Sequence, residues 1–248
     1  EGVWLATVDA FNDSTSISRL LRNEIQRVFC DRLTSVEDFN IVDTKVAQLF
    51  GRDEAIMKNP LVFGDYEHAV RRLAEDHEDP RIYREVSGTR EIFDGVVEQY
   101  NAEKGGALAN LVLFQQALEH VTRIYRIIRL PRGNALLVGV GGSGKQSLAK
   151  LATFCAGYQL FSISQVRNYG EQEFKEDLKK LYTLLGESSE VVFLFADSHV
   201  ANESFFEFLN NMLTTGMVPA LYEQDEKDTL CNSVRSEVKA RGIVDTPD

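Results

Sequence analysis

The chain has 248 residues, of which 44% are hydrophobic and 26% charged, a composition typical of a globular protein that buries a sizeable core. Its formal net charge is −11, from 27 Lys and Arg against 38 Asp and Glu. Because nucleic acids and anionic membranes bind clustered cations, this balance argues against either one as a dedicated partner. The sequence also contains no signal peptide and no apolar run near the ~20 residues of a membrane span.

The three cysteines, Cys30, Cys155 and Cys231, are far apart in the sequence. No C-x-x-C pair accompanies them, and no histidine stands at metal-ligand spacing. We therefore expect reduced, mostly buried thiols in a cytosolic protein. The abrupt start and end of the chain lead us to expect a piece of a longer protein.

The first half of the chain has the apolar spacing of helices. One helix is predicted from Ser16 to Leu33, and Ser35 with Asp38 forms an S-x-x-D capping pattern for a second helix that ends at Phe50. The Asn59–Pro60 pair then breaks the pattern. Three more helices are predicted, over Tyr66 to Glu78, Arg90 to Asn101 and Phe114 to Ile128, with a turn at Gly105–Gly106 before the last.

Beyond Pro131, strands and helices alternate. The predicted strands are Asn134 to Val140, Tyr158 to Ser164 and Val191 to Ala196, and the predicted helices are Gly144 to Ala156, Phe174 to Leu185, Phe205 to Leu213 and Asp225 to Arg241. The run from Val191 is fully apolar, which is typical of a central parallel strand covered on both faces. The alternation predicts an α/β fold with a doubly wound parallel sheet over 59–248, after a helical segment over 1–58.

A glycine-rich segment joins the first of these strands to the first of these helices. It fits the pattern G-x-x-x-x-G-K, in which glycines let backbone amides turn toward phosphates and the helix start adds its dipole. The lysine supplies a positive charge to the β- and γ-phosphates. The nucleotide-binding residues predicted here are Gly139, Val140, Gly141, Gly142, Ser143, Gly144, Lys145, Gln146 and Ser147.

The position after the lysine departs from this pattern. A Ser or Thr hydroxyl normally binds Mg²⁺ there, whereas this chain has Gln146, with Ser147 one place later. One residue rotates a helical side chain by about 100°, so Ser147 does not replace the missing hydroxyl. We expect weak or water-mediated binding of Mg²⁺.

The strand from Val191 ends on Asp197, in the manner of a Walker B strand whose Asp holds the metal. The base that activates water is usually a Glu at the next position, but here it is Ser198, a poor base at neutral pH. Since general-base catalysis contributes ~10²–10⁴ in rate, we expect slow or absent hydrolysis. His199 and Glu203 are the alternative bases, although His199 is better interpreted as a loop or helix-cap residue than as a base. No residue is assigned a catalytic role.

Together these residues resemble a known family. The segment Asn134 to Leu148 resembles the phosphate loop in the fourth AAA+ module of dynein heavy chains, especially of the axonemal type. Leu111 to Arg132 resembles the helix that leads into that loop, and Phe208 to Ala220 resembles the helix and loop after the Walker B strand. Arg27 to Leu33 resembles the lid of the preceding, third module.

The resemblance implies a P-loop NTPase fold of the AAA+ type, a three-layer sandwich, truncated before sensor 1 and preceded by the third module's lid over 1–58. It implies ATP or ADP, with Mg²⁺, as ligands, and base contacts from Leu61, Val62 and Phe63, which are equally consistent with a hydrophobic staple. Arg27 is either a sensor arginine for the third module or part of a surface salt bridge.

For the parent protein, the resemblance implies an ATP-driven microtubule motor in the cytoplasm and cytoskeleton, in the axoneme of a cilium or flagellum. Its partners would be the neighbouring AAA+ modules, the microtubule and other dynein chains, with no nucleic acid and no membrane. Gln146 and Ser198 favour a regulatory module that binds nucleotide with little turnover. The alternatives are an ATPase with an unconventional base, a structural ring element, and an unrelated P-loop kinase or transferase, for which the sequence shows no arginine-rich lid or acceptor pocket.

Overall fold

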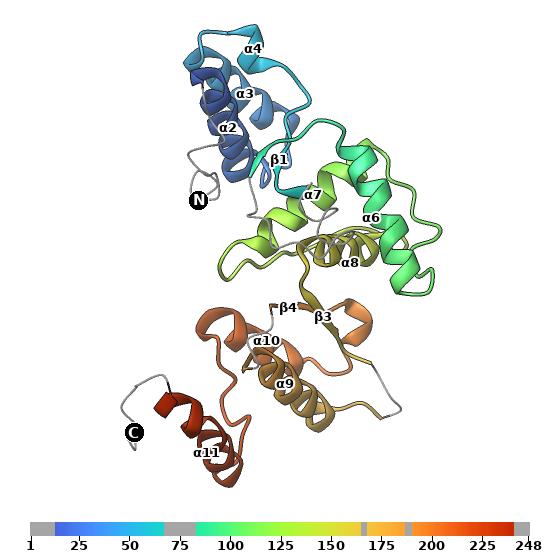
Figure 1. The fold of residues 1–248 in the computed structure, drawn as a ribbon, viewed down its shortest axis with the longest axis vertical. Coiled ribbons are helices and arrows are strands. Elements are labelled where there is room, and N and C mark those ends of the chain that lie inside the picture. Colours follow the sequence, from blue (N-terminus) through green and yellow to red (C-terminus); the bar gives the residue numbers. More distant parts are fainter. Residues whose placement is uncertain (1–12, 67–82, 165–167, 187–189, 241–248) are drawn as a thin grey trace. The chain divides into compact units, whose positions relative to one another are not determined.

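The computed structural model describes residues 13–66, 83–164, 168–186 and 190–240 (Figure 1). They belong to two compact units, unit 1 from Glu1 to Leu160 and unit 2 from Phe161 to Asp248. The helical segment before residue 59 belongs to unit 1, so a domain boundary at residue 58 stays a prediction. Most of the helix predicted from Tyr66 to Glu78 lies outside the described residues.

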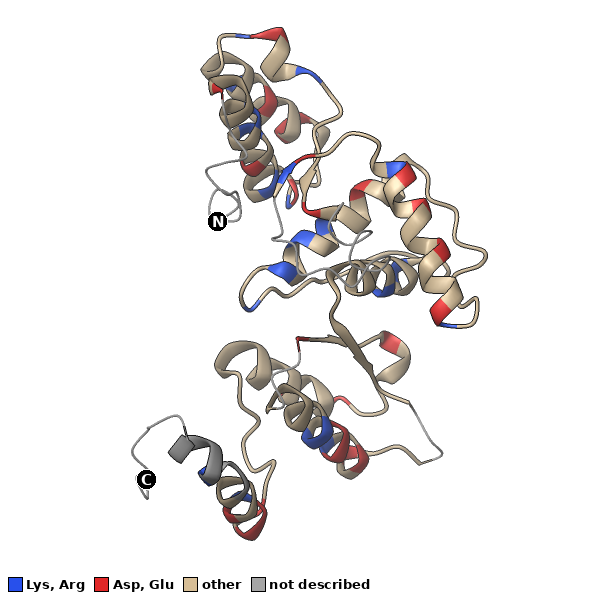
Figure 2. Ribbon diagram, in the orientation of Figure 1, with Lys and Arg blue, Asp and Glu red and all other residues tan. Residues whose placement is uncertain are grey.

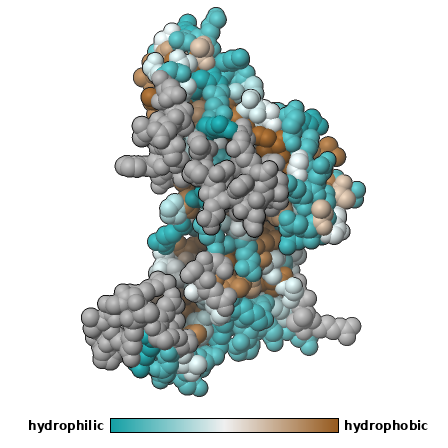
Figure 3. All heavy atoms as spheres, viewed as in Figure 1, coloured by the Kyte–Doolittle hydropathy of each residue, from teal (hydrophilic) through white to brown (hydrophobic). Residues whose placement is uncertain are grey.

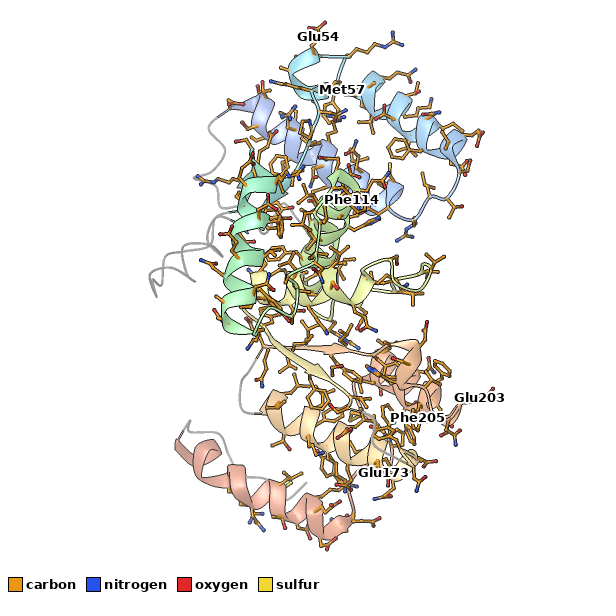
Figure 4. The ribbon with its side chains drawn as sticks, turned by 90° about the vertical axis from the view of Figure 1, so that its right-hand side faces the viewer. Glu54, Met57, Phe114, Glu173, Glu203 and Phe205 are labelled. Carbon is orange, nitrogen blue, oxygen red and sulfur yellow. The ribbon has the colours of Figure 1, made fainter. Side chains whose placement is uncertain are left out.

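Unit 1 begins with a group of helices. They are α2 (Ser14–Ile25), which continues into a π-helix η2 (Gln26–Cys30), α3 (Val36–Leu49) and the short α4 (Glu54–Met57), whose two ends are labelled in Figure 4. The Asp13 carboxylate accepts a hydrogen bond from Ser16 N at 2.6 Å, and the Ser35 hydroxyl accepts one from Asp38 N at 3.4 Å. Each cap satisfies an amide that the first helical turn leaves without a partner, so the predicted start at Ser35 is confirmed.

The rest of unit 1 is a small antiparallel strand pair and three longer helices. The strands β1 (Phe63–Gly64) and β2 (Arg84–Glu85) place Phe63 opposite Glu85, and Val86 N donates to Val62 O at 2.9 Å. The helices are α6 (Thr89–Glu103), α7 (Gln115–Arg129) and α8 (Lys145–Ala156). The predicted helices over these residues and the turn at Gly105–Gly106, where both φ angles are positive, are therefore confirmed.

The core of unit 1 lies where α6, α7 and α8 pack together. Phe93, Val96, Val121, Leu151 and Ala152 from these helices are fully buried. The apolar residues occur at helical spacing, so each helix buries one stripe and exposes the other. This packing holds the amino-terminal half of α8, and with it the glycine-rich segment, on a rigid base.

Unit 2 contains one strand–helix–strand connection followed by two helices. The strands β3 (Gln159–Ser162) and β4 (Val191–Leu194) are hydrogen-bonded neighbours joined through α9 (Glu171–Gly186), and a 3₁₀ turn η3 (Asp197–His199), α10 (Ser204–Thr215) and α11 (Gln224–Ala240) follow. The rings of Phe174 and Phe205 stack at 4.3 Å in the core. In the view of Figure 3, the described surface of this unit is mainly hydrophilic.

Two predictions need correction. Residues 134–140 form no strand, because no described strand of unit 1 pairs with them, and Leu136, Val138 and Val140 are 89, 86 and 78% exposed. The residues of β4 are half-buried rather than fully covered on both faces, and among the described strands β4 pairs with β3 alone, so it is not a central strand there. The expectation of mostly buried thiols is confirmed: Cys30 and Cys155 are buried, and Cys231 is exposed on the largely solvent-facing α11.

Candidate nucleotide-binding site

The glycine-rich segment runs directly into the amino terminus of α8. Gly144 is the residue before the helix, with φ +81°, and Gly142 has φ +77°. Side chains other than glycine rarely adopt this left-handed region, so the loop conformation depends on glycine at both positions. The twelve-residue helix directs its free amides and positive dipole end at the loop, which is an arrangement suited to an anion.

Lys145 folds back over the loop. Its ammonium Nζ donates to Gly139 O at 2.6 Å and Val140 O at 2.8 Å, and it lies 3.4 Å from Ser143 Oγ. The ammonium is therefore held on the same loop whose amides face the helix start. Residues 139–143 are exposed, so a phosphate chain reaches them without displacing packed side chains. These residues fit the phosphates of a nucleotide.

The predicted metal ligands are less complete. Gln146 is exposed and Ser147 is half-buried on α8, so the residue that follows the lysine offers an amide oxygen in place of a hydroxyl. Asp197 opens the η3 turn of unit 2 and is exposed. Within the part of the chain that the structure describes, no group of three or more His, Cys, Asp or Glu is arranged to hold a metal ion. A Mg²⁺ ion at Gln146 would therefore need further oxygen ligands, such as nucleotide phosphates or water.

The residues proposed as substitute bases have structural contacts of their own. His199 Nδ1 accepts a hydrogen bond from Ala196 N at 3.1 Å, and its ring meets Phe195 edge-on at 5.6 Å. Burial lowers the pKa of His199, which keeps the imidazole neutral and its Nδ1 free to accept. Glu203 is the exposed residue before α10, labelled in Figure 4. These contacts favour a capping role for His199.

The three residues predicted to contact the base line a cavity of about 570 Å³ in unit 1. Leu61, Val62 and Phe63 face it together with residues of α2, η2, α3 and α7, whereas none of its described lining residues comes from the phosphate loop. Phe63 is also packed against Leu20 and Tyr83, as a staple would be. The structure thus brings the base segment to a cavity but leaves both interpretations of it open.

Buried ionic contacts around this segment were not foreseen from the sequence. Arg19 and Arg22, one turn apart on α2, are 8 and 2% exposed, and Figure 2 shows basic residues on both α2 and α7. Arg126 on α7 pairs with Glu24 at 2.5 Å. Charged residues at i and i+3 on a buried helix face are the sequence signal that would have revealed them.

A second network joins the end of β1 to the two helices beside it. Asp65 accepts hydrogen bonds from Tyr125 and, at 3.4 Å, from Arg129, and Arg129 also donates to the Tyr158 hydroxyl at 3.1 Å. Burial, with Asp65 second, raises the pKa of Tyr125 well above its usual range, so the phenol stays a donor. Tyr158 lies two residues beyond the end of α8, so this network links the carboxyl end of that helix to Asp65, two residues after the predicted base segment.

Arg27 makes a salt bridge in the structure. Its guanidinium lies 3.2 Å from the Asp31 carboxylate one helical turn away, and Arg123 of α7 lies 3.4 Å from the same carboxylate. The salt-bridge interpretation of Arg27 therefore has direct structural support, although Arg27 also lines the cavity.

Comparison with known proteins places this site in a family. A glycine-rich phosphate loop at the start of a helix, followed by alternating strands and helices, defines a P-loop NTPase. Residues 109–248 match the family model described as the P-loop-containing dynein motor region D4. The chain therefore belongs to this dynein family, and both the expected α/β AAA+ fold and the resemblance to a fourth module are confirmed.

Individual relatives agree with this assignment. The chain is 46% identical to the dynein-1-alpha heavy chain of the flagellar inner arm I1 complex of Chlamydomonas reinhardtii, over 99% of this chain. It is 44% identical to human dynein axonemal heavy chain 10, over 98%, and 39% identical to the C. reinhardtii dynein beta chain of the flagellar outer arm, over 99%. The names of these relatives agree with the expected cytoskeletal location in a cilium or flagellum.

The chain spans only 6% of the length of each of these relatives. Among the described residues, no helix is both long and apolar enough to cross a membrane.

Proposed function

We propose that this chain is a regulatory nucleotide-binding module of an axonemal-type dynein heavy chain, which holds ATP or ADP with little turnover. The observation that carries the proposal is the loop from Gly139 to Lys145, with two left-handed glycines and an ammonium held over it at the start of α8. A loop of this form binds phosphates through backbone amides, the helix dipole and the lysine charge.

Two departures support retention over hydrolysis. Gln146 stands where a hydroxyl would bind Mg²⁺, which lowers the stabilisation of charge that builds up during phosphoryl transfer. Ser198 stands where a carboxylate base would activate water, and the nearby His199 already accepts a backbone hydrogen bond. The second candidate, a hydrolysing module with an unconventional base, would require Glu203 or His199 to act instead.

In the parent protein, the module would sit in a ring between neighbouring AAA+ modules and modulate a main ATPase elsewhere in that ring. The parent would be an ATP-driven motor that moves on microtubules in a cilium or flagellum, with other dynein chains as partners. The support is the family match together with the axonemal and flagellar relatives. Nucleic acid and membrane are not proposed as partners, in keeping with the net charge of −11.

Equilibrium binding of a fluorescent ATP analogue tests the phosphate site. Lys145→Ala should weaken binding by about a hundredfold or more, because a charge-assisted contact to two phosphates is lost. Lys150→Ala is the matched control, since it removes the same charge from the same helix five residues beyond the loop. Equal affinity of all three proteins would overturn the site, and absent binding to the wild type would favour a structural ring element.

A further inference from the structure

Arg19 contacts residues next to both ends of the predicted base segment, Leu61 to Phe63. Its Nη1 donates to three carbonyl oxygens just before the segment, those of Ala55 at 2.7 Å, Ile56 at 3.2 Å and Lys58 at 3.0 Å. Its Nε donates to Glu85 Oε2 at 2.7 Å, and Glu85 is the residue opposite Phe63 in the β1–β2 pair. One guanidinium therefore connects the chain entering the segment with the strand that pairs with its last residue.

Arg22 strengthens the first of these connections. Its Nη1 donates to Ile56 O at 3.1 Å and Lys58 O at 3.3 Å, and its Nη2 donates to Asn59 Oδ1 at 2.9 Å. Of the three carbonyls that the two arginines hold, those of Ala55 and Ile56 belong to α4, where carbonyls of the last turn have no partner within the helix. The arginines of α2 thus replace the missing helical partners and fix the direction in which the chain leaves toward Leu61.

We propose that Arg19 and Arg22 are positioning residues that set the affinity of this site for the base of the nucleotide. The proposal rests on the nucleotide-binding function proposed above. Neither arginine needs to touch the nucleotide, because both act through the segment 59–63 that they hold. Since they lie on a helix that the sequence assigns to the preceding module, a shift of α2 would change how tightly this module holds its base.

The alternative is that the arginines only stabilise the fold. The two roles differ in which part of the ligand they affect. Inorganic tripolyphosphate carries the phosphate charges of ATP without a base, so it reports on the loop from Gly139 to Lys145 alone. If the arginines position the base segment, substituting them lowers the affinity for ATP and leaves the affinity for tripolyphosphate unchanged. If they only stabilise the fold, substituting them lowers both affinities.

The decisive experiment is calorimetric titration of the chain with ATP and with tripolyphosphate, for wild type and Arg19→Lys. Lysine keeps the charge, but one ammonium does not span Glu85 and the carbonyls as a guanidinium fork does. We expect the ratio of ATP affinity to tripolyphosphate affinity to fall about tenfold, with tripolyphosphate affinity unchanged. An unchanged ratio, through equal losses or no loss, would overturn the proposal.

Glu85→Gln is the second variant, in case Arg19→Lys fails to fold. It keeps the side-chain shape on a largely exposed residue and weakens only the link to β2. The matched control is Asp94→Asn, which makes the same change of charge at the exposed Arg90–Asp94 pair. The ratio should fall in Glu85→Gln and not in Asp94→Asn, and equal ratios in the two variants would contradict the inference.

The wild-type result separates the two proposals. A wild type that binds neither ligand would refute the nucleotide site itself, and this inference with it. A wild type that binds tripolyphosphate as tightly as ATP would leave the phosphate loop standing and overturn the positioning role, because the base would then contribute nothing.

Discussion

At the residue scale, the chemistry of the site depends on single positions beside the phosphate loop. Gln146 occupies the place of a magnesium-binding hydroxyl, and it offers a bulkier amide oxygen where Mg²⁺ favours compact ligands in octahedral geometry. Lys145 and the glycines are unaffected by this change. We therefore expect the same loop to bind phosphate and to bind metal weakly.

Restoring the hydroxyl should restore the response to magnesium. In Gln146→Thr, the ratio of ATP affinity in Mg²⁺ to ATP affinity in excess chelator should rise about tenfold over that of the wild type. Fluorescence titration under the two conditions measures it. Identical ratios in the two proteins would show that Gln146 does not limit metal binding.

Two adjacent phenylalanines of α10 test how far burial alone decides stability. Phe205 is fully buried, stacked on Phe174 at 4.3 Å, while Phe206 is 55% exposed. We expect Phe205→Ala to lower the free energy of unfolding by about 3–5 kcal/mol and Phe206→Ala by less than about 1 kcal/mol. Urea unfolding of both variants makes the comparison, and similar losses would contradict the described packing.

At the element scale, helices were predicted well and strands poorly. The helices around Ser35, Phe93 and Val121 can be predicted because their caps and apolar stripes lie within one contiguous segment. A strand is completed by a neighbour that lies elsewhere in the chain, so apolar composition alone predicted a strand at 134–140 where the described residues supply no partner. The short β1–β2 pair was missed because each strand has only two residues.

In the candidate site, too, features within one segment were predicted and contacts between distant residues were not. The phosphate loop was found from the sequence because its function resides in a contiguous pattern, and its glycines have the left-handed φ angles that such a pattern requires. The hydrogen bonds from Arg19 to Ala55 and Glu85 were not predicted from the sequence, since they join residues 36 and 66 positions apart. Contacts at such separations depend on the fold and leave no local pattern.

His199, in the turn after β4, should make the free energy of unfolding depend on pH. Because burial lowers the pKa of His199 below its ordinary value of 6.5, the unfolded chain binds this proton more readily than the folded chain. Its stabilising contribution is complete above pH 6.5 and is lost as the pH falls through the folded-state pKa. Protonation also converts Nδ1 from acceptor to donor and breaks the bond from Ala196 N.

Urea unfolding at pH 7.5 and pH 5.5 measures this effect, with His199→Gln as the reference that does not titrate. The wild type should lose more free energy of unfolding between these two values of pH than the variant does. A loss of the same size in both proteins would show that the imidazole is not held neutral by the fold.

At the scale of the whole molecule, we propose a module that binds nucleotide and whose occupied state affects the neighbouring parts of the parent protein. Family membership and the axonemal relatives supply the context, and the loop at α8 supplies the chemistry. The arginines of α2 hold the chain that leads from α4 into the predicted base segment. If the site retains its nucleotide, the arginines would act on a site that stays in one bound state. A site that hydrolyses nucleotide quickly would not stay in one state.

The measurement that tests retention most directly is phosphate release by the intact heavy chain with its main ATPase site disabled, compared with the same protein carrying Lys145→Ala. We predict that nucleotide remains bound at this site and that the two proteins release phosphate at the same low rate. A release rate that is substantial in the first protein and vanishes with Lys145→Ala would contradict the account, because this module would then hydrolyse ATP.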